Sequence, residues 1–297
     1  MVSGCVLEPS LLSLVKQVPG GKVTTYGALA RALGDPIAAR WVGKVLSENY
    51  RSDVPCHRVI MSDLSLGGYN KGVDEKVKKL KEEGIDVAAG RVNEKIFEDF
   101  VTSYPLRRYA ETQLKLAQKV VLEGDLKVGR VAGIDVSYRE GGKGVCSIFD
   151  LSDGSLIEEL TIVKRPKFPY IPTYLSFREG GFIIELVKMM SKEERKDCIL
   201  LIDGNGYMHP RKCGLASHVG VVLDMPTIGV AKSRLCGKSG EKGEIYINQE
   251  LVGFAIGGNR YVSPGHRVSA YGSRRFVRRL LEAGIAPLRR AHRTSRP

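Results

Sequence analysis

The chain has 297 residues, of which 43% are hydrophobic and 27% charged, a composition typical of a soluble globular protein that excludes a disordered chain. This length exceeds what one compact core usually needs, so we expect one large domain or two unequal ones. The net charge of +13 favours an anionic partner such as nucleic acid or a membrane surface, although surplus lysine can also serve solubility alone.

The first part of the chain predicts small helices. Helical apolar spacing indicates three of them, at residues 10–18, 26–34 and 37–49. Thr24 or Thr25 can cap the second helix, and a turn through Asp35-Pro36 separates it from the third. Two short helices joined by a tight turn are typical of a helix-turn-helix, although many helical pairs look the same.

The next segments complete a first domain. Residues 54–61 are β-like, the stretch LSLGGY is a glycine turn, and the charged residues 74–84 predict a helix. Residues 86–95 are small and polar, and we interpret them as a linker. The domains expected from this pattern cover residues 1–88 and 95–297.

Beyond residue 95 the pattern predicts strands that alternate with helices. The expected helices cover residues 98–121, 180–190 and 273–284. The expected strands cover residues 131–138, 144–151, 156–164, 197–206, 226–233 and 250–257. This alternation favours an α/β domain. The basic excess lies at its end, because residues 267–297 hold nine arginines and the single acid Glu282.

The spacing of the cysteines indicates whether the protein occupies an oxidising or a reducing compartment. The six cysteines form no CxxC or CxxxxC pair; they are Cys5, Cys56, Cys146, Cys198, Cys213 and Cys236. This excludes a disulfide scaffold and a zinc site, so we expect reduced thiols in a cytoplasmic protein. No segment reaches the roughly 18 apolar residues of a membrane span. Glu8 and Pro9, close behind Met1, are unlike a signal peptide, and we expect no membrane partner.

The stretch VPCHRV, residues 54–59, raises the question of what Cys56 does. A metal ligand is excluded, because adjacent Cys and His cannot both reach one ion and no second pair lies nearby. A buried structural cysteine remains open, since free cysteines often pack as small hydrophobes. His57 and Arg58 would favour the thiolate, the form that attacks electrophiles. A cysteine protease also uses Cys and His, but usually takes them from distant parts of the chain.

Residues 18–84 resemble the C-terminal, active-site domain of alkylguanine-DNA alkyltransferase. The matching segments, in the same order and spacing, are VPGGKVTTYGALARALG, ARWVGKVLSEN, VPCHRV, LGGYNKG and the K…EEG tail. The resemblance implies a small helical domain of the winged helix-turn-helix type. It also implies that Cys56 irreversibly accepts an alkyl group from guanine O6, while His57 and Glu83 relay its proton through a water. The partner would be damaged double-stranded DNA, because a base must leave the duplex before its O6 can meet a thiolate.

The same resemblance assigns residues that handle the base. Arg40 would be the finger that fills the stack after the base flips out, since an inserted side chain offsets the lost stacking. Tyr26 would help to turn the nucleotide. Asn49 and Tyr69 would help to shape the pocket, although they could also merely cap and pack.

Two departures from this family matter. Residues 1–17 supply only one helix where this family usually has an N-terminal half-domain, so we expect that half-domain to be missing. The related alkyltransferase-like proteins bind the same lesions without reaction and have tryptophan at the cysteine position. Because this chain has Cys56, a working acceptor is favoured.

Three acids of the second part could form a metal site. Asp135 lies inside an apolar strand and Asp203 ends another, and an unpaired carboxylate is costly there. Asp203 could otherwise cap a turn, and Glu179 could be a solvated helix acid. Converging carboxylates fit Mg²⁺, which takes carboxylate and water oxygens and can activate water for phosphodiester cleavage. Lys232 and His266 would add a cation and a proton-transfer group.

Residues 100–285 resemble endonuclease V. The motifs that carry the resemblance are VAGIDVSY, PYIPTYLSFRE, LLIDGNGYMHPRKCGLASHVG, MPTIGVAKSRLCG and YVSPGHRVS. It implies an RNase H-like fold and a magnesium-dependent nuclease in which Mn²⁺ can substitute. Such an enzyme would recognise deaminated bases, chiefly inosine, and nick one bond further along on the 3′ side.

The match carries over five catalytic positions, the first three of them as metal ligands: Asp135, Glu179, Asp203, Lys232 and His266. The segment Pro169-Tyr170-Ile171-Pro172 matches a strand-separating wedge. Gly214 matches the pocket for the flipped base, and His209, which could otherwise be a core histidine, lies near it. The segment before the last motif is shortened, and the arginine expected there is replaced around Gly257-Gly258. The final APLRRAHRTSRP also departs from the usual ending.

The sequence therefore predicts a fused DNA-repair protein that joins alkylation reversal to cleavage beside deaminated bases. In one alternative, the N-terminal module only senses lesions and delivers the nuclease. In the other, the nuclease acts on inosine in RNA. We expect a monomer that acts on damaged double-stranded DNA, with inosine-containing single-stranded DNA or RNA as further substrates.

Overall fold

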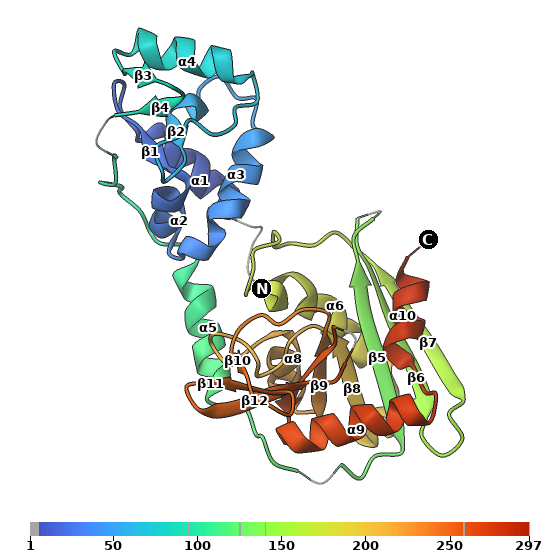
Figure 1. Cartoon of the computed structure of the whole chain (residues 1–297). Helices are drawn as coiled ribbons and strands as arrows, with labels where there is room; N and C mark the ends of the chain where they lie inside the picture. Colours follow the sequence, from blue (N-terminus) through green and yellow to red (C-terminus); the bar gives the residue numbers. More distant parts are fainter. Residues whose placement is uncertain (1–5, 94–95, 125, 140, 258, 297) are drawn as a thin grey trace. The chain divides into compact units, whose positions relative to one another are not determined.

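The computed structural model describes residues 6–93, 96–124, 126–139, 141–257 and 259–296. The chain divides into two compact units (Figure 1), one formed by Met1–Tyr109 with Phe168–Pro172 and the other by Ala110–Lys167 with Thr173–Pro297. The predicted order of a helical domain followed by an α/β domain is confirmed. Gly258, part of the segment predicted to be shortened, lies outside the described residues, as do linker residues 94 and 95. In the part that is described, no helix is long and apolar enough to cross a membrane.

The first unit is mainly helical. Its elements are α1 (Leu7–Lys16), β1 (Thr24–Thr25), α2 (Tyr26–Leu33), η1 (Pro36–Ala38), α3 (Ala39–Ser47), η2 (Cys56–Arg58), β2 (Val59–Ile60), α4 (Val73–Glu82), β3 (Val87–Ala88) and β4 (Arg91–Val92). The predicted helix pair forms as α2 and α3. Thr25 caps α2, because its Oγ1 accepts a hydrogen bond from the Ala28 N–H at 3.0 Å. Gly34 ends α2 with a φ of 109°, a left-handed value that favours glycine.

Two segments of this unit differ from the prediction. Residues 54–61 contain the 3₁₀ turn η2 before the short strand β2, which pairs in parallel with β1. The expected linker at 86–95 contains the hairpin β3–β4, and its Val92 is buried in the core of the unit. Gly90 has a φ of 73°, so the small residues that resembled a linker form a tight turn instead.

Helix α5 (Arg107–Ala117) is shorter than the helix predicted over residues 98–121. Pro105 explains the difference, because proline lacks an N–H and pushes the residue before it out of the helical region. Tyr104, the preceding residue, has a φ of 49°. The helix therefore begins only after Pro105.

The second unit contains a large sheet between helices. Its remaining elements are β5 (Arg130–Ser137), β6 (Lys143–Asp150), β7 (Leu156–Val163), α6 (Leu175–Met189), α7 (Lys192–Lys196), β8 (Cys198–Asp203), α8 (Leu215–Leu223), β9 (Thr227–Ala231), β10 (Lys238–Ser239), β11 (Glu244–Ile247), β12 (Glu250–Ala255), β13 (Tyr261–His266), α9 (Ala270–Glu282) and α10 (Pro287–Ser295).

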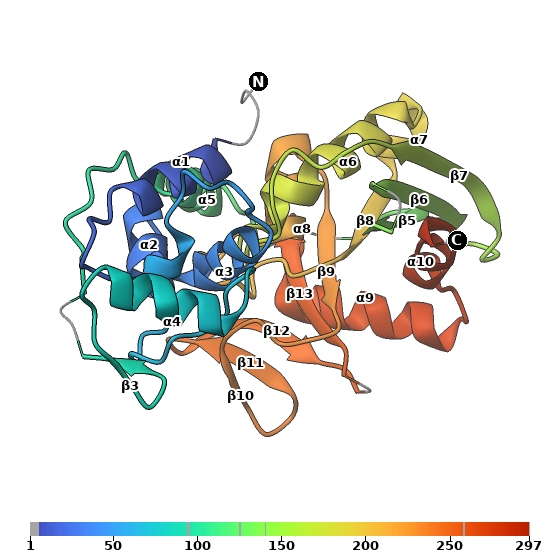
Figure 2. The same ribbon diagram turned by 90° about the horizontal axis from the view of Figure 1, so that it is seen from above.

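The strands of this unit form a nine-stranded sheet in the order β10-β11-β12-β13-β9-β8-β5-β6-β7. The sheet is mixed, because β8 is parallel to both β5 and β9 while the other neighbours are antiparallel. Helices α6 and α8 cover one face, and α9 and α10 cover the other (Figure 2). The C-terminal ends of β5 and β8 therefore lie side by side, between the two helical layers.

Helix α10 is an element that the sequence did not predict. Its buried positions are Pro287, Ala291 and Ser295, which are too small or too polar to produce an apolar helical pattern. The helix approaches the sheet at Gly133 on β5, where an added Cβ would lie 2.2 Å from the Pro287 carbonyl carbon. Glycine at this position therefore permits the close packing of α10.

Polar contacts hold the rest of α10 on the sheet. Lys143 Nζ donates to the Thr294 carbonyl at 2.7 Å, and Ser137 Oγ donates to the Ser295 carbonyl. These two contacts satisfy carbonyls that the end of a helix leaves without an intrahelical partner. The helix is thus anchored at its first turn by close packing and at its last turn by side chains of β5 and β6.

Candidate active sites

Cys56 begins the turn η2 and is only 7% exposed. Asn49, two residues beyond the end of α3, donates from Nδ2 to the Cys56 Sγ at 3.2 Å. Cys56 lines two cavities of about 420 and 340 Å³. Cavities of this size lie within the range of roughly 300–1,000 Å³ that is typical of small-ligand sites. The thiol is therefore buried but adjoins space that a ligand can enter.

Glu83 connects two neighbours of the cysteine. Its carboxylate accepts from Arg58 at 2.7 and 2.9 Å and lies 2.8 Å from His57 Nε2. Burial would raise the pKa of Glu83, but the hydrogen bonds from Arg58 and His57 outweigh burial and hold its pKa below the ordinary value. Burial lowers the pKa of His57, so its ring is neutral near pH 7. Because Glu83 can only accept, Nε2 carries the proton and Nδ1 is left as the basic nitrogen.

The expectation that His57 and Arg58 favour the Cys56 thiolate is wrong for the resting site. Burial raises the pKa of Cys56, and the opposing hydrogen bond from Asn49 does not offset it. The Arg58 guanidinium is turned to Glu83 and donates to the Val18 carbonyl at 2.6 Å. The resting cysteine is a thiol, so an attack by sulfur requires a base to remove its proton.

Lys76 is a buried residue that the sequence reasoning missed. Its ammonium on α4 donates to the carbonyls of Val59 at 2.6 Å and Gly68 at 3.2 Å, and also to Leu66. Burial lowers its pKa to about 8. The three carbonyls belong to β2 and to the glycine turn, so Lys76 ties together two segments beside the cysteine cavities. A lysine within a charged helical run gives no sequence signal of this inward orientation.

The structure brings three of the predicted base-handling residues to Cys56. Tyr26 and Tyr69 line the smaller cavity with it, and Asn49 lines the larger one. The Tyr69 ring meets the His57 ring edge-on, with centroids 6.5 Å apart. Arg40 lies on α3 with its side chain exposed.

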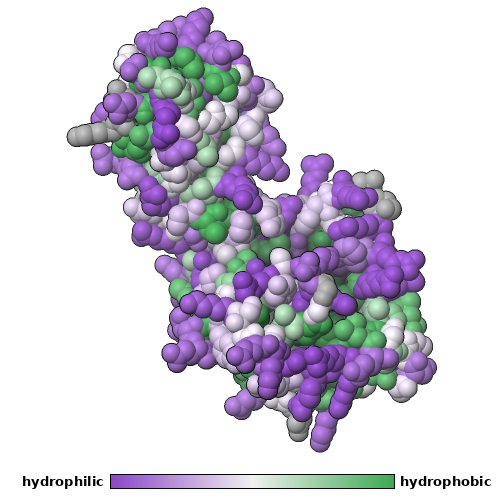
Figure 3. Space-filling model, in the orientation of Figure 1, coloured by the Kyte–Doolittle hydropathy of each residue, from purple (hydrophilic) through white to green (hydrophobic). Residues whose placement is uncertain are grey.

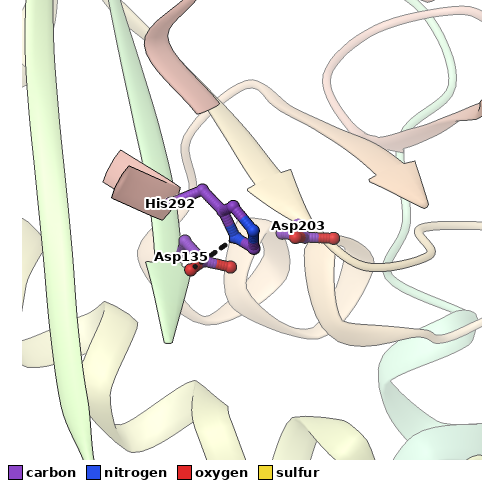
Figure 4. Close-up of side chains that lie close together, drawn as sticks. All are labelled: Asp135, Asp203 and His292. Carbon is purple, nitrogen blue, oxygen red and sulfur yellow. Dashed lines mark hydrogen bonds and ion pairs between the residues drawn. The ribbon is translucent and has the colours of Figure 1, made fainter. Parts of the chain in front are cut away.

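Asp135 and Asp203 come together in the second unit. They occupy adjacent parallel strands, one position beyond the paired residues Ile134 and Ile202. Their ligand atoms and a ring nitrogen of His292, on α10, all lie within 4.8 Å of one another (Figure 4). Two strand ends and the last helix thus supply one polar cluster on the α9–α10 face of the sheet.

Each carboxylate of this cluster has a partner. Asp135 Oδ2 accepts from Ser295 Oγ at 2.6 Å and lies 3.2 Å from His292 Nδ1. Lys232 Nζ, on the residue that follows β9, donates to Asp203 at 2.8 Å. His292 and Ser295 both come from the unpredicted helix α10, and sequence spacing alone gave no sign of them.

The two carboxylates and the imidazole of this cluster are ligands that suit a divalent cation. Burial raises the pKa of Asp203, with Asp135 adding to the effect and Lys232 opposing it. Burial, together with the charges of Asp135 and Asp203, raises the pKa of Glu179 to about 8. Buried acids that disfavour one another's charge are stabilised when a cation is present. Carboxylate oxygens suit Mg²⁺ and Mn²⁺, and imidazole nitrogen is a further ligand that Mn²⁺ accepts.

His266 is not brought to these carboxylates. It pairs with Thr227 at the start of β9, whereas Asp203 pairs with Val230 toward the end of the same strand. The buried His266 ring accepts from the Val121 N–H at 3.2 Å and lies 3.2 Å from Asp224 Oδ1. In this structure His266 joins loops on the opposite side of the sheet from the cluster.

The predicted wedge has one exposed and one buried side chain. Tyr170 is 63% exposed, while Ile171 is only 1% exposed. Phe168 packs edge-on against Tyr109, with ring centroids 4.9 Å apart. Between half-buried Pro169 and Pro172, the Tyr170 ring therefore projects from a segment that is fixed at its base.

The residues predicted around the flipped base lie at the start of α8. A Cβ on Gly214 would be 2.3 Å from the Asn205 carbonyl oxygen, so this position requires glycine. His209 is buried, its Nε2 lies 2.9 Å from the Thr173 carbonyl, and burial lowers its pKa to about 4. His209 is therefore neutral and orients the segment before α8.

Comparisons with known proteins identify a family for each part of the chain. The family model for endonuclease V matches residues 114–293. The family model described as 6-O-methylguanine DNA methyltransferase, DNA binding domain, matches residues 8–85. The solved catalytic domain of human endonuclease V is 27% identical, with a TM-score of 0.56, and the match covers 66% of this chain and 96% of that one.

Two relatives extend over both parts of the chain. A Picrophilus torridus protein named bifunctional methyltransferase/endonuclease is 45% identical over 274 residues, which cover 91% of this chain and 89% of that protein. A Nanoarchaeum equitans protein named bifunctional methyltransferase-like/endonuclease is 37% identical, and the match covers 90% of this chain and 83% of that protein. The chain therefore belongs to the bifunctional methyltransferase/endonuclease family.

Proposed function

We propose that the protein repairs DNA by two independent reactions. The first unit transfers an alkyl group from guanine O6 to Cys56, and the second nicks DNA on the 3′ side of a deaminated base such as deoxyinosine. The observation that supports the first reaction is a thiol at a ligand-sized cavity beside the His57–Glu83 pair. The observation that supports the second is the cluster of Asp135, Asp203 and His292.

Proton removal is central to the proposed alkyl transfer. Neutral His57 takes the thiol proton at Nδ1, through a water, while Glu83 accepts from Nε2 and stabilises the imidazolium that forms. The Cys56 sulfur then bonds to the alkyl carbon as the bond from that carbon to guanine O6 breaks. The base regains a proton and leaves as guanine, and Cys56 becomes a thioether. The thioether has no route back to a thiol, so each molecule reacts once.

In the proposed nuclease, Asp135, Asp203 and His292 would hold Mg²⁺, or Mn²⁺ in its place. Glu179, which the sequence resemblance assigned as a third ligand, is not among the three residues whose ligand atoms are grouped, and His292 takes its place in this proposal. The bound ion supplies charge stabilisation and an activated water for phosphodiester cleavage. Ser295 donates to Oδ2 of Asp135 and would orient this carboxylate toward the ion. Lys232 balances the charge of Asp203, and Glu179 can hold a proton near neutral pH.

DNA distortion is required at both sites, because neither a buried thiol nor a recessed base pocket can reach a stacked base. In the first unit, which we propose to be of winged helix-turn-helix type, α3 would present Arg40 to the duplex. Tyr170, on the segment Phe168–Pro172 that groups with the first unit, would open the stack. In the second unit, which we propose to be RNase H-like, the backbone at Gly214 would receive the base. The net charge of +13 supports DNA as the partner.

The experiment that tests the proposal uses two duplexes, one with O6-methylguanine and one with deoxyinosine. We expect the protein to gain a single methyl mass from the first and to nick the second when Mg²⁺ is present. Nicking without a mass gain would support the alternative in which the first unit only senses lesions. A matched RNA strand that contains inosine tests the other alternative: cleavage of RNA in preference to DNA would redirect the nuclease assignment.

A further inference from the structure

A cavity of the α/β unit adjoins the carboxylate cluster. It has a volume of about 390 Å³ and lies on the face of the sheet that α9 and α10 cover. Asp203 and His292 line it, so the cavity is continuous with the candidate metal site. Its size lies within the range of small-ligand sites, roughly 300–1,000 Å³.

The walls of this cavity are aliphatic. They are formed by side chains from β8, β9, α9 and the loop before α10: Leu201, Val230, Val277, Leu280, Leu281 and Ile285. Leu281 is 43% exposed, so apolar surface reaches solvent at the mouth. Hydrophobic surface is also visible between α9 and α10 in the space-filling view, above the hydrophilic side chains of α9 (Figure 3). Exposed apolar walls beside a polar reaction centre are typical of a ligand site.

Cations lie at the rim of the same cavity. Lys232, Arg260 and Arg289 line it, and all three are exposed. An apolar interior with a cationic rim suits a ligand that has a flat, weakly polar body and an anionic group. A nucleotide has this chemistry, since its base can lie between aliphatic side chains while its phosphate meets lysine and arginine.

The location of the cavity indicates which nucleotide it can take. Gly214, proposed to receive the flipped base, begins α8 on one face of the sheet. The cavity lies on the other face, and the carboxylates lie at the strand ends beside it. A strand whose flipped base is near α8 and whose reacting phosphate is at Asp135 and Asp203 therefore continues toward the α9–α10 face.

We infer that this cavity is a binding subsite for the nucleotide just beyond the cleaved bond, the second nucleotide on the 3′ side of deoxyinosine. The inference rests on the proposed nuclease function. The base of that nucleotide lies against Leu281 and Ile285, and its phosphates face Lys232 and Arg289. The cavity thereby helps to hold the reacting phosphate at the carboxylates.

Duplexes that lack a single base test this subsite. A set of deoxyinosine duplexes is made in which one 3′ nucleotide at a time is abasic, and KM and kcat for nicking are measured for each. With the wild-type protein we expect KM to rise about tenfold when the second nucleotide is abasic, because a bound base is typically worth that much or more. The other downstream abasic positions serve as internal controls.

Two variants change the cavity and leave the carboxylate cluster unchanged. Leu281→Asn makes the mouth polar, and Ala286→Trp fills the cavity from another exposed lining position. Both should raise KM on the intact duplex and should no longer respond to loss of the second base. Leu156→Asn, at a comparably exposed leucine outside the cavity, should behave as wild type. Thermal midpoints show whether each variant is folded.

The outcomes distinguish the subsite from the nuclease itself. If wild-type protein nicks the intact duplex but responds equally to an abasic nucleotide at every downstream position, the subsite is wrong while the nuclease stands. Retention of the full response to the second base by both cavity variants would also overturn it. Failure of the wild-type protein to nick any deoxyinosine duplex would overturn the nuclease proposal and the subsite together.

Discussion

His57 sets the pH dependence that we expect for alkyl transfer. Burial lowers its pKa from the ordinary value of about 6.5, so the neutral base persists to lower pH than in a solvated histidine. The rate should therefore fall with a midpoint below pH 6.5, as His57 becomes protonated.

The rate of methyl transfer from O6-methylguanine duplexes, measured at each pH, checks this expectation. His57→Gln should slow the reaction by about 10²–10⁴-fold and should remove the decline at low pH. Circular dichroism at each pH shows whether the domain stays folded. A decline centred above pH 6.5 would contradict the assignment of His57 as a buried neutral base.

Half-buried His292 and buried His266 distinguish the site that the structure forms from the one that the sequence motif suggests. His292 contacts Asp135. His266, the last residue of β13, contacts Asp224 instead. We expect His292→Ala to reduce nicking by about 10²-fold at limiting Mg²⁺ and to raise the Mg²⁺ concentration needed, because a ligand is lost.

The matched variant His266→Ala should mainly lower the thermal midpoint, because it leaves the Val121 N–H without its acceptor. Mg²⁺ titrations of nicking, together with melting curves, measure both effects. The opposite pattern, with Mg²⁺ dependence altered by His266→Ala alone, would support the role for His266 that the sequence motif suggests.

At the scale of elements, α10 depends on one glycine. A Cβ at position 133 would lie 2.2 Å from the Pro287 carbonyl carbon, so Gly133→Ala must displace the first turn of α10. Overpacking of this kind costs about 1–3 kcal/mol, and it moves the helix that holds His292 and Ser295 at Asp135. We expect nicking to fall sharply while methyl transfer to Cys56 is unchanged.

Gly181→Ala provides the control for this variant, since Gly181 lies in α6 and an added Cβ there meets nothing within 4 Å. Both activities and the unfolding free energy should be measured for the pair of variants. Wild-type nicking by Gly133→Ala would show that the position of α10 does not matter to the reaction.

The exposed ring of Tyr170, in the proposed wedge segment, leads to a separate prediction. The Tyr170 ring is 63% exposed and stands between prolines, which restrict the backbone and lower the entropy lost on insertion. We expect Tyr170→Ala to leave the thermal midpoint nearly unchanged and to weaken binding to deoxyinosine duplexes. The defect should shrink for single-stranded or mismatched DNA, where less stacking has to be broken.

Affinity measurements on duplex, mismatched and single-stranded deoxyinosine substrates test this expectation, with melting curves as the control for folding. An equal loss of affinity for all three substrates, or a large drop in thermal midpoint, would instead show that Tyr170 supports the fold.

For the whole molecule, the sequence predicted what local motifs encode. The two domains and their families follow from stretches such as VPCHRV and LLIDGNG, and the comparisons confirm both families. Asp135, inside one apolar strand, and Asp203, at the end of another, were predicted to converge, and they lie one position beyond the paired residues Ile134 and Ile202 of adjacent parallel strands. The catalytic roles assigned to individual residues stay predictions.

Features that depend on tertiary packing were not predictable in this way. Helix α10 has small and polar buried positions, so its pattern gives no sign that it meets the sheet at Gly133 or that His292 reaches Asp135. The predicted protonation state of Cys56 was wrong for a similar reason. Adjacent positive charges suggested a thiolate, but Arg58 pairs with Glu83, and burial then raises the pKa of Cys56.

The central claim is that one chain carries two reactions with separate chemistry. The most direct measurement mixes an O6-methylguanine duplex with a deoxyinosine duplex and follows protein mass and DNA strand length together, in the presence of Mg²⁺. Wild-type protein should gain one methyl mass and nick the second duplex. Cys56→Ala should only nick, and Asp203→Ala should only gain the methyl mass. A methyl mass on Cys56→Ala at the wild-type rate, or undiminished nicking by Asp203→Ala at limiting Mg²⁺, would contradict the account.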